Sequence, residues 1–293
     1  MSSSAVFFQL FINGILLGSM YGVAAIGLSL IFGSMEIIFI AQGSVMILAA
    51  YCTFFLHHLY QLDPFFSVLV VLPGFVLFGF LLYMLLFRKL AGLGKNAPLL
   101  LSFGLMIFLE NLMSVLWTPN TRAVTTSYTT LGLTFLDLRI SITRLMVFTL
   151  AILATAAVSL WLRFTLTGKA VRASTEHLSA ARLMGINPVK VRTITFGIGI
   201  GLAGLAGTAT AAASPFDPTF GFLFSLNALI AVAIGGIGSV VGALMGGIML
   251  GVLESAGAYL FTGVWASAVS YTAFLIVLMV RPEGLFTRSS RRA

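Results

Sequence analysis

Most of this chain consists of apolar stretches long enough to cross a bilayer. A membrane-spanning helix needs about 20 apolar residues, and stretches of that kind occur near 6–33, 37–60, 65–87, 97–117, 142–162, 193–213 and 263–280. Only 8% of the residues are charged, whereas an average soluble domain has roughly a quarter. The sequence therefore predicts an all-α, polytopic membrane protein in which residues 1–293 form a single transmembrane domain.

The basic residues are scattered between the apolar stretches. The 16 Lys and Arg against 8 Asp and Glu give a net charge of +8. Because they form no continuous stripe, we expect the lipid bilayer, and no nucleic acid, as a partner. The single cysteine, Cys52, excludes an intramolecular disulfide and a Cys-based metal site. Phosphate-loop, zinc-protease and serine-hydrolase motifs are absent. We therefore expect no catalytic residue, metal or cofactor in this chain, and uphill transport would need energy from another subunit or an ion gradient.

The distribution of Lys and Arg predicts the orientation, because short cytoplasmic loops are enriched in these residues. Placing the loops 88–96 and 163–192 and the tail 281–293 inside leaves only Arg122, Arg139 and Arg144 outside. Counting crossings backwards from 88–96 puts the N-terminus outside, and this arrangement requires a cytoplasmic C-terminus.

The segment 222–280 is too long for a single membrane crossing and barely long enough for three. Gly235, Gly236 and Gly238 interrupt the apolar run there. Irregular backbone at membrane depth is tolerated only where protein or a water-filled cavity satisfies it. We therefore expect eight or nine membrane elements, including a broken or re-entrant helix near 235–238 that is a candidate for the transport path.

Polar residues inside spans are costly and therefore informative. They are Glu36 and Gln42 at the start of the second span, Glu110 and Asn111 in the fourth, Asn227, and Glu254. Glu36 and Glu254 are compatible with interfacial positions. Glu110 is the strongest case for an interior carboxylate, and both a helix-to-helix hydrogen bond and a substrate contact fit it, the hydrogen bond being the simpler interpretation.

Glycines recur every four residues in two places. One row is Gly14, Gly18 and Gly22, and the other is Gly238, Gly242 and Gly246, joined by Gly247 and Gly251. Such rows let a second helix approach closely. Close static packing explains them, and a moving interface in a transporter is the alternative.

The longest charged segment is the predicted cytoplasmic loop 164–192. Its centre, Ala173 to Met184, contains good helix formers, and Gly185 followed by Ile186-Asn187-Pro188 predicts a helix stop. A short amphipathic helix here could dock into a groove of a soluble partner, and a solvated charged loop is the alternative.

Several motifs resemble one transporter family. Ser179-Ala-Ala-Arg-Leu-Met-Gly185 is similar to the E-A-A-x-x-x-G signature of ATP-binding-cassette (ABC) importer permeases, with Ser179 in place of Glu. The wider pattern resembles LivH-like permeases of branched-chain amino-acid uptake systems. The matching stretches are Gly168-Lys-Ala-Val-Arg-Ala173, Ala180 to Asn187, Thr195-Phe-Gly-Ile-Gly199, Leu202-Ala-Gly-Leu-Ala-Gly207, Ile234-Gly-Gly-Ile-Gly-Ser239 with Gly242-Ala243 and Gly246-Gly247, and Arg281-Pro-Glu-Gly-Leu-Phe286.

This resemblance implies a non-catalytic permease subunit in the bacterial inner membrane. Its implied partners are a second LivH- or LivM-like permease, two cytoplasmic ATPases that use ATP, and a periplasmic or extracellular solute-binding protein. Residues 173–187 are the implied coupling helix. The implied ATPase-coupling residues are Glu176, His177, Ala180, Ala181, Arg182, Gly185, Ile186 and Asn187.

The chain also departs from the family. The family usually has Ile-Asn-Phe-Ala-His-Gly where this chain has Ile38-Phe-Ile-Ala-Gln-Gly43, and often has Lys where this chain has Asn227. The solute is therefore a branched-chain or related amino acid, or alternatively urea, a short amide or an aromatic acid. The candidate translocation path comprises Phe39, Gln42, Glu110, Asn227, Gly235, Gly236 and Gly238.

Two other classes of protein compete with this interpretation. A self-sufficient channel or secondary carrier would use Glu110 and the glycine break alone, but it leaves the inner loop unexplained. An intramembrane enzyme is disfavoured, because the spans contain no nucleophile–base or metal-ligand pair.

Overall fold

The computed structural model describes residues 3–90, 94, 96–126, 128–129, 132–135, 138–260, 264–281 and 284–286. Lys95, the Pro282-Glu283 part of one family motif, and the tail arginines Arg288, Arg291 and Arg292 lie outside the described residues. What the sequence predicts for those positions therefore stays a prediction.

The described chain is almost entirely helical. The long elements are α1 (Ser3–Met35), α2 (Gln42–Tyr60), α3 (Pro64–Leu82), α5 (Asn96–Trp117), α6 (Ile142–Phe164), α9 (Pro188–Ala213), α10 (Gly221–Gly235), α11 (Val240–Leu260) and α12 (Val264–Val280). Shorter ones are the π-helical η1 (Tyr83–Phe87), α4 (Arg88–Leu90), α7 (Leu166–Glu176), α8 (Leu178–Leu183) and the 3-10 helix η2 (Pro218–Phe220). The loop after α5 carries a hairpin, β1 (Gly132–Phe135) and β2 (Leu138–Ser141), with Gly132 opposite Ser141. This hairpin adds a small antiparallel element to the expected all-α fold.

Eight of these helices are long and apolar enough to span a membrane, and Ser267–Met279 within α12 forms a shorter apolar helix. The expectation of eight or nine membrane elements is therefore confirmed. The expected break is also found, because α10 ends at Gly235 and α11 begins at Val240. The described part of residues 222–280 therefore forms three helices.

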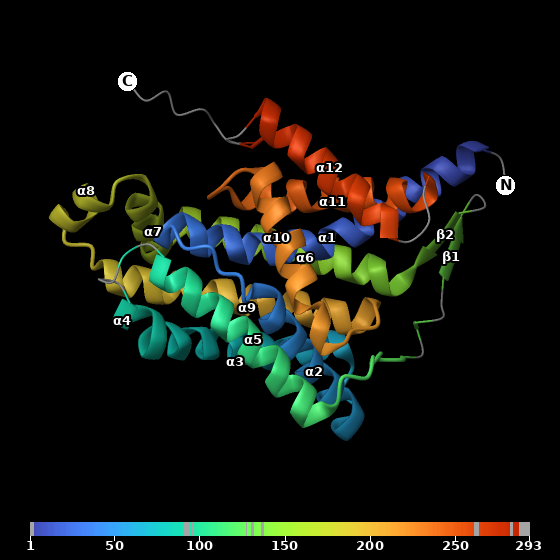
Figure 1. Cartoon of the computed structure of the whole chain (residues 1–293), viewed down its shortest axis with the longest axis horizontal. Helices are drawn as coiled ribbons and strands as arrows, with labels where there is room; N and C mark the ends of the chain where they lie inside the picture. The colour runs from blue at the N-terminus through green and yellow to red at the C-terminus, as the bar shows by residue number, and fades with distance from the viewer. Residues whose placement is uncertain are drawn as a thin grey trace.

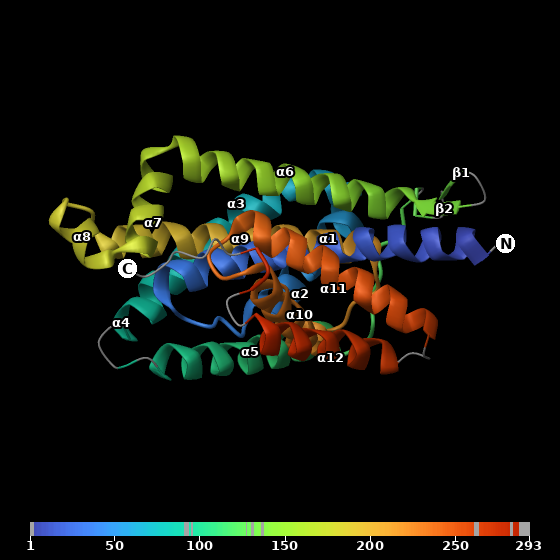
Figure 2. The same cartoon turned by 90° about the horizontal axis from the view of Figure 1, so that it is seen from above.

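The helices differ in how deeply they are buried. In the most apolar stretch of each span, 83% of the residues of α1 and 89% of those of α9 are buried, whereas 28% are buried in the spans that contain α3, α5 and α6. Helices α1, α9 and α11 run side by side through the middle, α6 and α5 lie on opposite edges, and α10 crosses the long direction (Figures 1 and 2). Helices α3, α5 and α6 therefore expose more of their residues on the outside of the bundle than α1 and α9 do.

Glycine rows form the tightest contact. A Cβ on Gly18 would lie 2.6 Å from the Cα of Ile248, and one on Gly14 would lie 2.6 Å from the Cα of Val252. The glycines of α11 serve two partners, since Gly247 and Gly251 face α1 while Gly242 and Gly246 face α10. The predicted close packing is thus found. Gly238 does not belong to this helical row, because it lies in the turn before α11 with φ +80°.

Two expected helices are interrupted. The predicted span 37–60 becomes helical only at Gln42, because residues 36–41 form an irregular segment. The expected single helix over 173–184 is wrong, since His177 takes an extended conformation (φ −146°, ψ 91°) between α7 and α8. α7 is anchored by Val171 and by the close contact of Gly168 with α6, whereas α8 buries only Ala181. The packing of α7 against α6 therefore fixes the axis of α7, and the chain bends at His177 so that α8 does not extend the same helix.

The ends of the bundle differ in character. One end carries α4, α7 and α8, and the opposite end carries the start of α1 and the hairpin (Figure 2). The described parts of the loops 88–96 and 163–192, which the charge pattern predicts on one side, therefore lie together.

Candidate functional site

The polar centre of the molecule is the beginning of α2. The irregular segment 36–41 leads into the bundle, and the first residues of α2, Gln42, Gly43 and Ser44, are completely or almost completely buried. A helix that begins inside a span presents unpaired backbone N–H groups and a partial positive charge at that depth. The structure must satisfy these groups with side chains from other helices.

Two serines from distant helices satisfy this backbone. The Ser225 hydroxyl on α10 accepts a hydrogen bond from the Gly43 N–H (2.8 Å) and donates one to the Ile40 carbonyl. The Ser102 hydroxyl on α5 accepts from the Ala41 N–H (3.2 Å). Sequence reasoning missed both serines, because serine in a membrane helix commonly bonds its own helix backbone and gives no signal.

Glu110 lies beside this helix start. The Ser44 hydroxyl donates to Glu110 Oε1 at 3.2 Å, and the backbone N–H of Phe222 also lies within hydrogen-bonding range of the carboxylate. A Cβ on Gly221 would lie 2.7 Å from Glu110 Oε1, so glycine is needed for this approach. The half-buried carboxylate is therefore held where α2, α5 and α10 meet.

Gln42 occupies the other side of the helix start. Its side chain is fully buried, and Nε2 donates to the Ala24 carbonyl of α1 at 3.3 Å. Its Oε1 is buried without a hydrogen-bond partner. A buried acceptor without a donor is costly, and a solute or a bound water carrying an N–H or O–H group would satisfy it.

Phe39 serves a different purpose. It is fully buried, with its ring 5.2 Å from that of Phe196 and 5.8 Å from that of Phe87, measured between centroids. This aromatic cluster contributes no polar group, so the structure places Phe39 in packing next to the polar helix start.

Asn227 belongs to a second polar cluster. Its Oδ1 accepts a hydrogen bond from the Tyr271 hydroxyl at 3.2 Å, and its carboxamide also interacts with the Tyr21 hydroxyl. Tyr21 contacts Glu254 as well, so four helices meet here. Sequence reasoning identified Asn227 and Glu254 separately and missed both tyrosines, which look like ordinary apolar aromatics in a span.

The glycine break forms a tight turn near the C-terminal end of α1. Gly236 and Gly238 have φ values of +97° and +80°, and the Gly238 N–H donates to the Ser29 hydroxyl at 3.1 Å. The chain after α12 packs onto this turn, where the Leu285 N–H donates to the Ile234 carbonyl at 2.8 Å. The structure therefore does not bring Gly235, Gly236 and Gly238 together with Gln42 and Glu110, but it connects the two places through α10.

The segment α7–α8 projects from the end of the bundle (Figure 2). A Schellman motif ends α8, because the Ile186 N–H donates to the Ala181 carbonyl and the Gly185 N–H to the Arg182 carbonyl, with Gly185 at φ +81°. Asn187 then caps α9 by accepting from the Val189 N–H. The predicted glycine stop is thus found.

Few of the expected coupling residues pack inside the chain. Ala181 is buried, and Ile186 and Asn187 line a groove of about 200 Å³ beside α7. The others, Glu176, His177, Ala180, Arg182 and Gly185, are exposed. Leu183 and Met184, which sequence reasoning did not include, are 89% and 83% exposed. The tip of α8 therefore presents apolar side chains to its surroundings.

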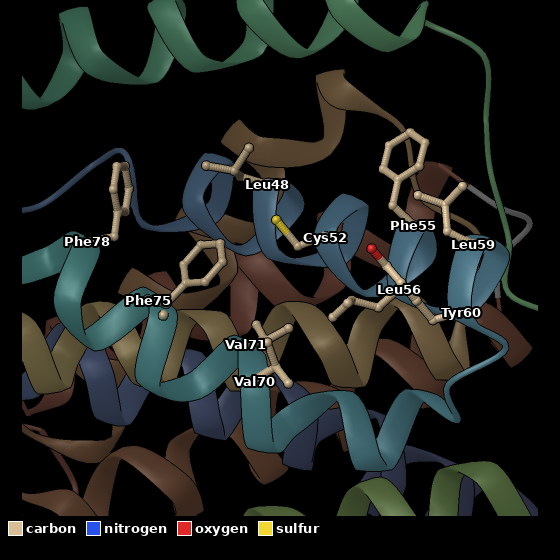
Figure 3. Close-up of a pocket in the computed structure, with 11 residues that line it drawn as sticks. Leu48, Cys52, Phe55, Leu56, Leu59, Tyr60, Val70, Val71, Phe75 and Phe78 are labelled. Atoms are coloured by element: carbon tan, nitrogen blue, oxygen red, sulfur yellow. The ribbon is translucent and has the colours of Figure 1, made fainter.

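A larger groove of about 520 Å³ lies between α2 and α3 (Figure 3). Its labelled lining residues are Leu48, Cys52, Phe55, Leu56, Leu59, Tyr60, Val70, Val71, Phe75 and Phe78. It contains no carboxylate or amide side chain, so it cannot orient a charged solute. Among the described residues, no group of three His, Cys, Asp or Glu side chains could hold a metal ion.

These features define a polytopic helical transport protein with a polar helix start inside the membrane. Residues 10–278 match the family model for the permease component of the branched-chain amino acid transport system, and the chain belongs to that family. No solved structure matches this chain.

Curated relatives match over nearly the whole chain. The high-affinity branched-chain amino acid transport system permease protein BraD of Pseudomonas aeruginosa is 30% identical over 96% of both chains. The corresponding permease protein LivH of Salmonella typhimurium is 31% identical over 96% of both chains. A probable branched-chain amino acid transport permease protein LivH of Methanocaldococcus jannaschii is 27% identical over 93% of this chain and 90% of the relative.

Proposed function

We propose that this chain is the translocation subunit of an ATP-driven importer for branched-chain or related amino acids. The observation that carries the proposal is a permease fold whose polar centre is a helix start inside the membrane, combined with an exposed helical projection at one end. The sequence contains no phosphate-binding loop, so hydrolysis of ATP falls to separate cytoplasmic subunits. A second permease and an external solute-binding protein complete the proposed assembly.

The positive-inside rule gives the proposed orientation. The chain lies in the bacterial inner membrane, and the end that carries α4, α7 and α8, with Arg88, Lys89, Lys169 and Arg172, faces the cytoplasm. The hairpin end faces outside. The tip of α8 then lies where a cytoplasmic ATPase can reach it, and Leu183 and Met184 are the proposed apolar contacts.

The polar helix start suits a zwitterion. The positive end of α2 complements a carboxylate, while Glu110 and the unpartnered Gln42 Oε1 complement an ammonium group. In this structure the hydroxyl groups of Ser102 and Ser225 accept hydrogen bonds from the backbone at the start of α2, so a solute can reach this backbone only if α5 or α10 moves away from α2.

Replacing the Glu110 carboxylate by a neutral amide tests whether the solute is a zwitterion. Glu110→Gln retains an acceptor for Ser44 but removes the negative charge. We expect it to reduce uptake of amino acids strongly and uptake of a neutral amide little. Equal effects on both solutes would remove Glu110 from solute recognition and leave it a helix-packing residue.

Purification from native membranes in mild detergent tests the assembly. We expect an ATPase and a second permease to co-purify, with ATP hydrolysis that rises on adding the loaded binding protein. If the chain is recovered alone and moves solute in liposomes without ATP, it is a channel or carrier and the proposal fails.

A further inference from the structure

The outward faces of the three least buried spans, α3, α5 and α6, differ in chemistry. On α3 the most exposed large side chains are apolar, as at Leu69 (73% exposed) and Leu77 (59%). On α6 the exposed Thr149 satisfies its hydroxyl within its own helix, by donating to the Leu145 carbonyl at 3.0 Å. Both faces therefore suit contact with lipid chains.

Helix α5 is different because its outward face carries a carboxamide. Asn111 is exposed, and its Nδ2 donates to the Ile107 carbonyl at 2.8 Å. Within the described chain its Oδ1 and second N–H have no hydrogen-bond partner. A polar group facing hydrocarbon is costly, whereas the same group between two helices gains a hydrogen bond.

The same face borders the polar helix start. Glu110, the neighbour of Asn111, contacts Ser44 and the start of α10. There Phe222 and Leu223 are 45% and 41% exposed. Helix α12 lies along the same edge of the bundle as α5 (Figure 2). The surface beside the candidate translocation site is thus open, although that site has to be shielded from lipid for a polar solute to pass.

We propose that the α5 face, defined by Phe108, Asn111 and Val115 together with the exposed start of α10, is the surface on which the second permease subunit packs. The partner contributes a membrane helix with a hydrogen-bonding side chain opposite Asn111 and an apolar surface against Phe108 and Val115. The solute path then runs between the two subunits, past Glu110. This inference rests on the proposed pairing with a second permease and adds its location.

Site-directed photo-crosslinking tests the location. Cys52 is the single cysteine, so Cys52→Ala gives a cysteine-free background. Phe108→Cys and Val115→Cys on α5, at positions that are 59% and 83% exposed, are compared with Leu153→Cys and Leu160→Cys on α6, at positions that are 61% and 56% exposed. Each cysteine is labelled with a thiol-reactive benzophenone in native membranes, and adducts are identified by mass spectrometry.

We expect adducts with a second permease subunit from the α5 positions and lipid adducts from the α6 positions. Asn111→Leu should lower recovery of the second permease by about three- to tenfold, while Thr149→Val on α6 leaves it unchanged. Lipid adducts alone from α5, in a preparation that contains the second permease, overturn the location and leave the pairing intact. If no second permease co-purifies with the unlabelled chain, the pairing itself fails.

Discussion

Replacing Leu183 by Ala tests whether the tip of α8 is the contact with the ATPase. Leu183 is 89% exposed on a short helix that a Schellman motif closes. Alanine is at least as good a helix former as leucine, so the substitution leaves the permease itself intact. Its effect appears only if this side chain becomes buried against a partner.

The magnitude follows from the carbon atoms removed. Leucine loses three carbons on conversion to alanine, and each buried methylene contributes about 0.8 kcal/mol. Full burial in the complex therefore predicts a loss of about 2.4 kcal/mol, or about 60-fold weaker binding of the ATPase subunits. Incomplete burial in the partner groove reduces this figure proportionally.

The assay is titration of the purified permease with its ATPase subunits, together with the ATP consumed per solute imported. Leu153→Ala on the outward face of α6 is the matched control, because it removes the same atoms from a 61% exposed site in the membrane. Binding of the Leu183→Ala protein within twofold of the unmodified permease would refute the proposed contact.

Three further outcomes are expected. Gly247→Val should destabilise the bundle by about 1–3 kcal/mol or more, because a Cβ there collides with the α1 backbone. A Cβ on Gly74 of α3 meets no atom within 4 Å, so Gly74→Val should be tolerated, and thermal denaturation in detergent compares the two variants. Ser225→Ala should cost about 1–3 kcal/mol for each of the two backbone groups that lose their partner, and unchanged stability would contradict the role of this serine. Burial and the 2.7 Å hydrogen bond to Asp63 raise the pKa of Tyr128 in the folded protein. The stabilisation that Tyr128 provides is therefore fully present below its pKa in the unfolded chain, about 10, and is lost as the pH rises through its pKa in the folded protein. Tyr128→Phe should abolish that alkaline dependence in a stability–pH profile.

The sequence predicts features that depend on local spacing. The glycine rows predict close helix packing, the cluster at 235–238 predicts a broken helix, and Gly185 predicts the end of α8. Each depends on residues within one or two turns of each other, so the pattern is visible without the rest of the chain. The partner of each row is not visible, and only the structure pairs Gly18 with α11.

Features that depend on distant residues could not be predicted. Residues 37–41 are all apolar, so they suggest a continuous span, yet Ser102 and Ser225 stabilise an irregular backbone there. Gln42 and Glu110 were identifiable because amide and acidic side chains in a span are costly. The tyrosines of the Asn227 cluster gave no such signal, because a tyrosine in a span satisfies the same hydropathy pattern as a phenylalanine.

The start of α2 also constrains the order in which the chain can assemble. The Gly43 N–H depends on a serine that the ribosome adds 182 residues later. Until α10 leaves the ribosome, the second span must stay in the translocon or keep water beside its unsatisfied backbone, because lipid cannot supply hydrogen bonds. The candidate translocation site is thus one of the last parts of the protein to be completed during biogenesis, and a truncated nascent chain that lacks α10 cannot form it.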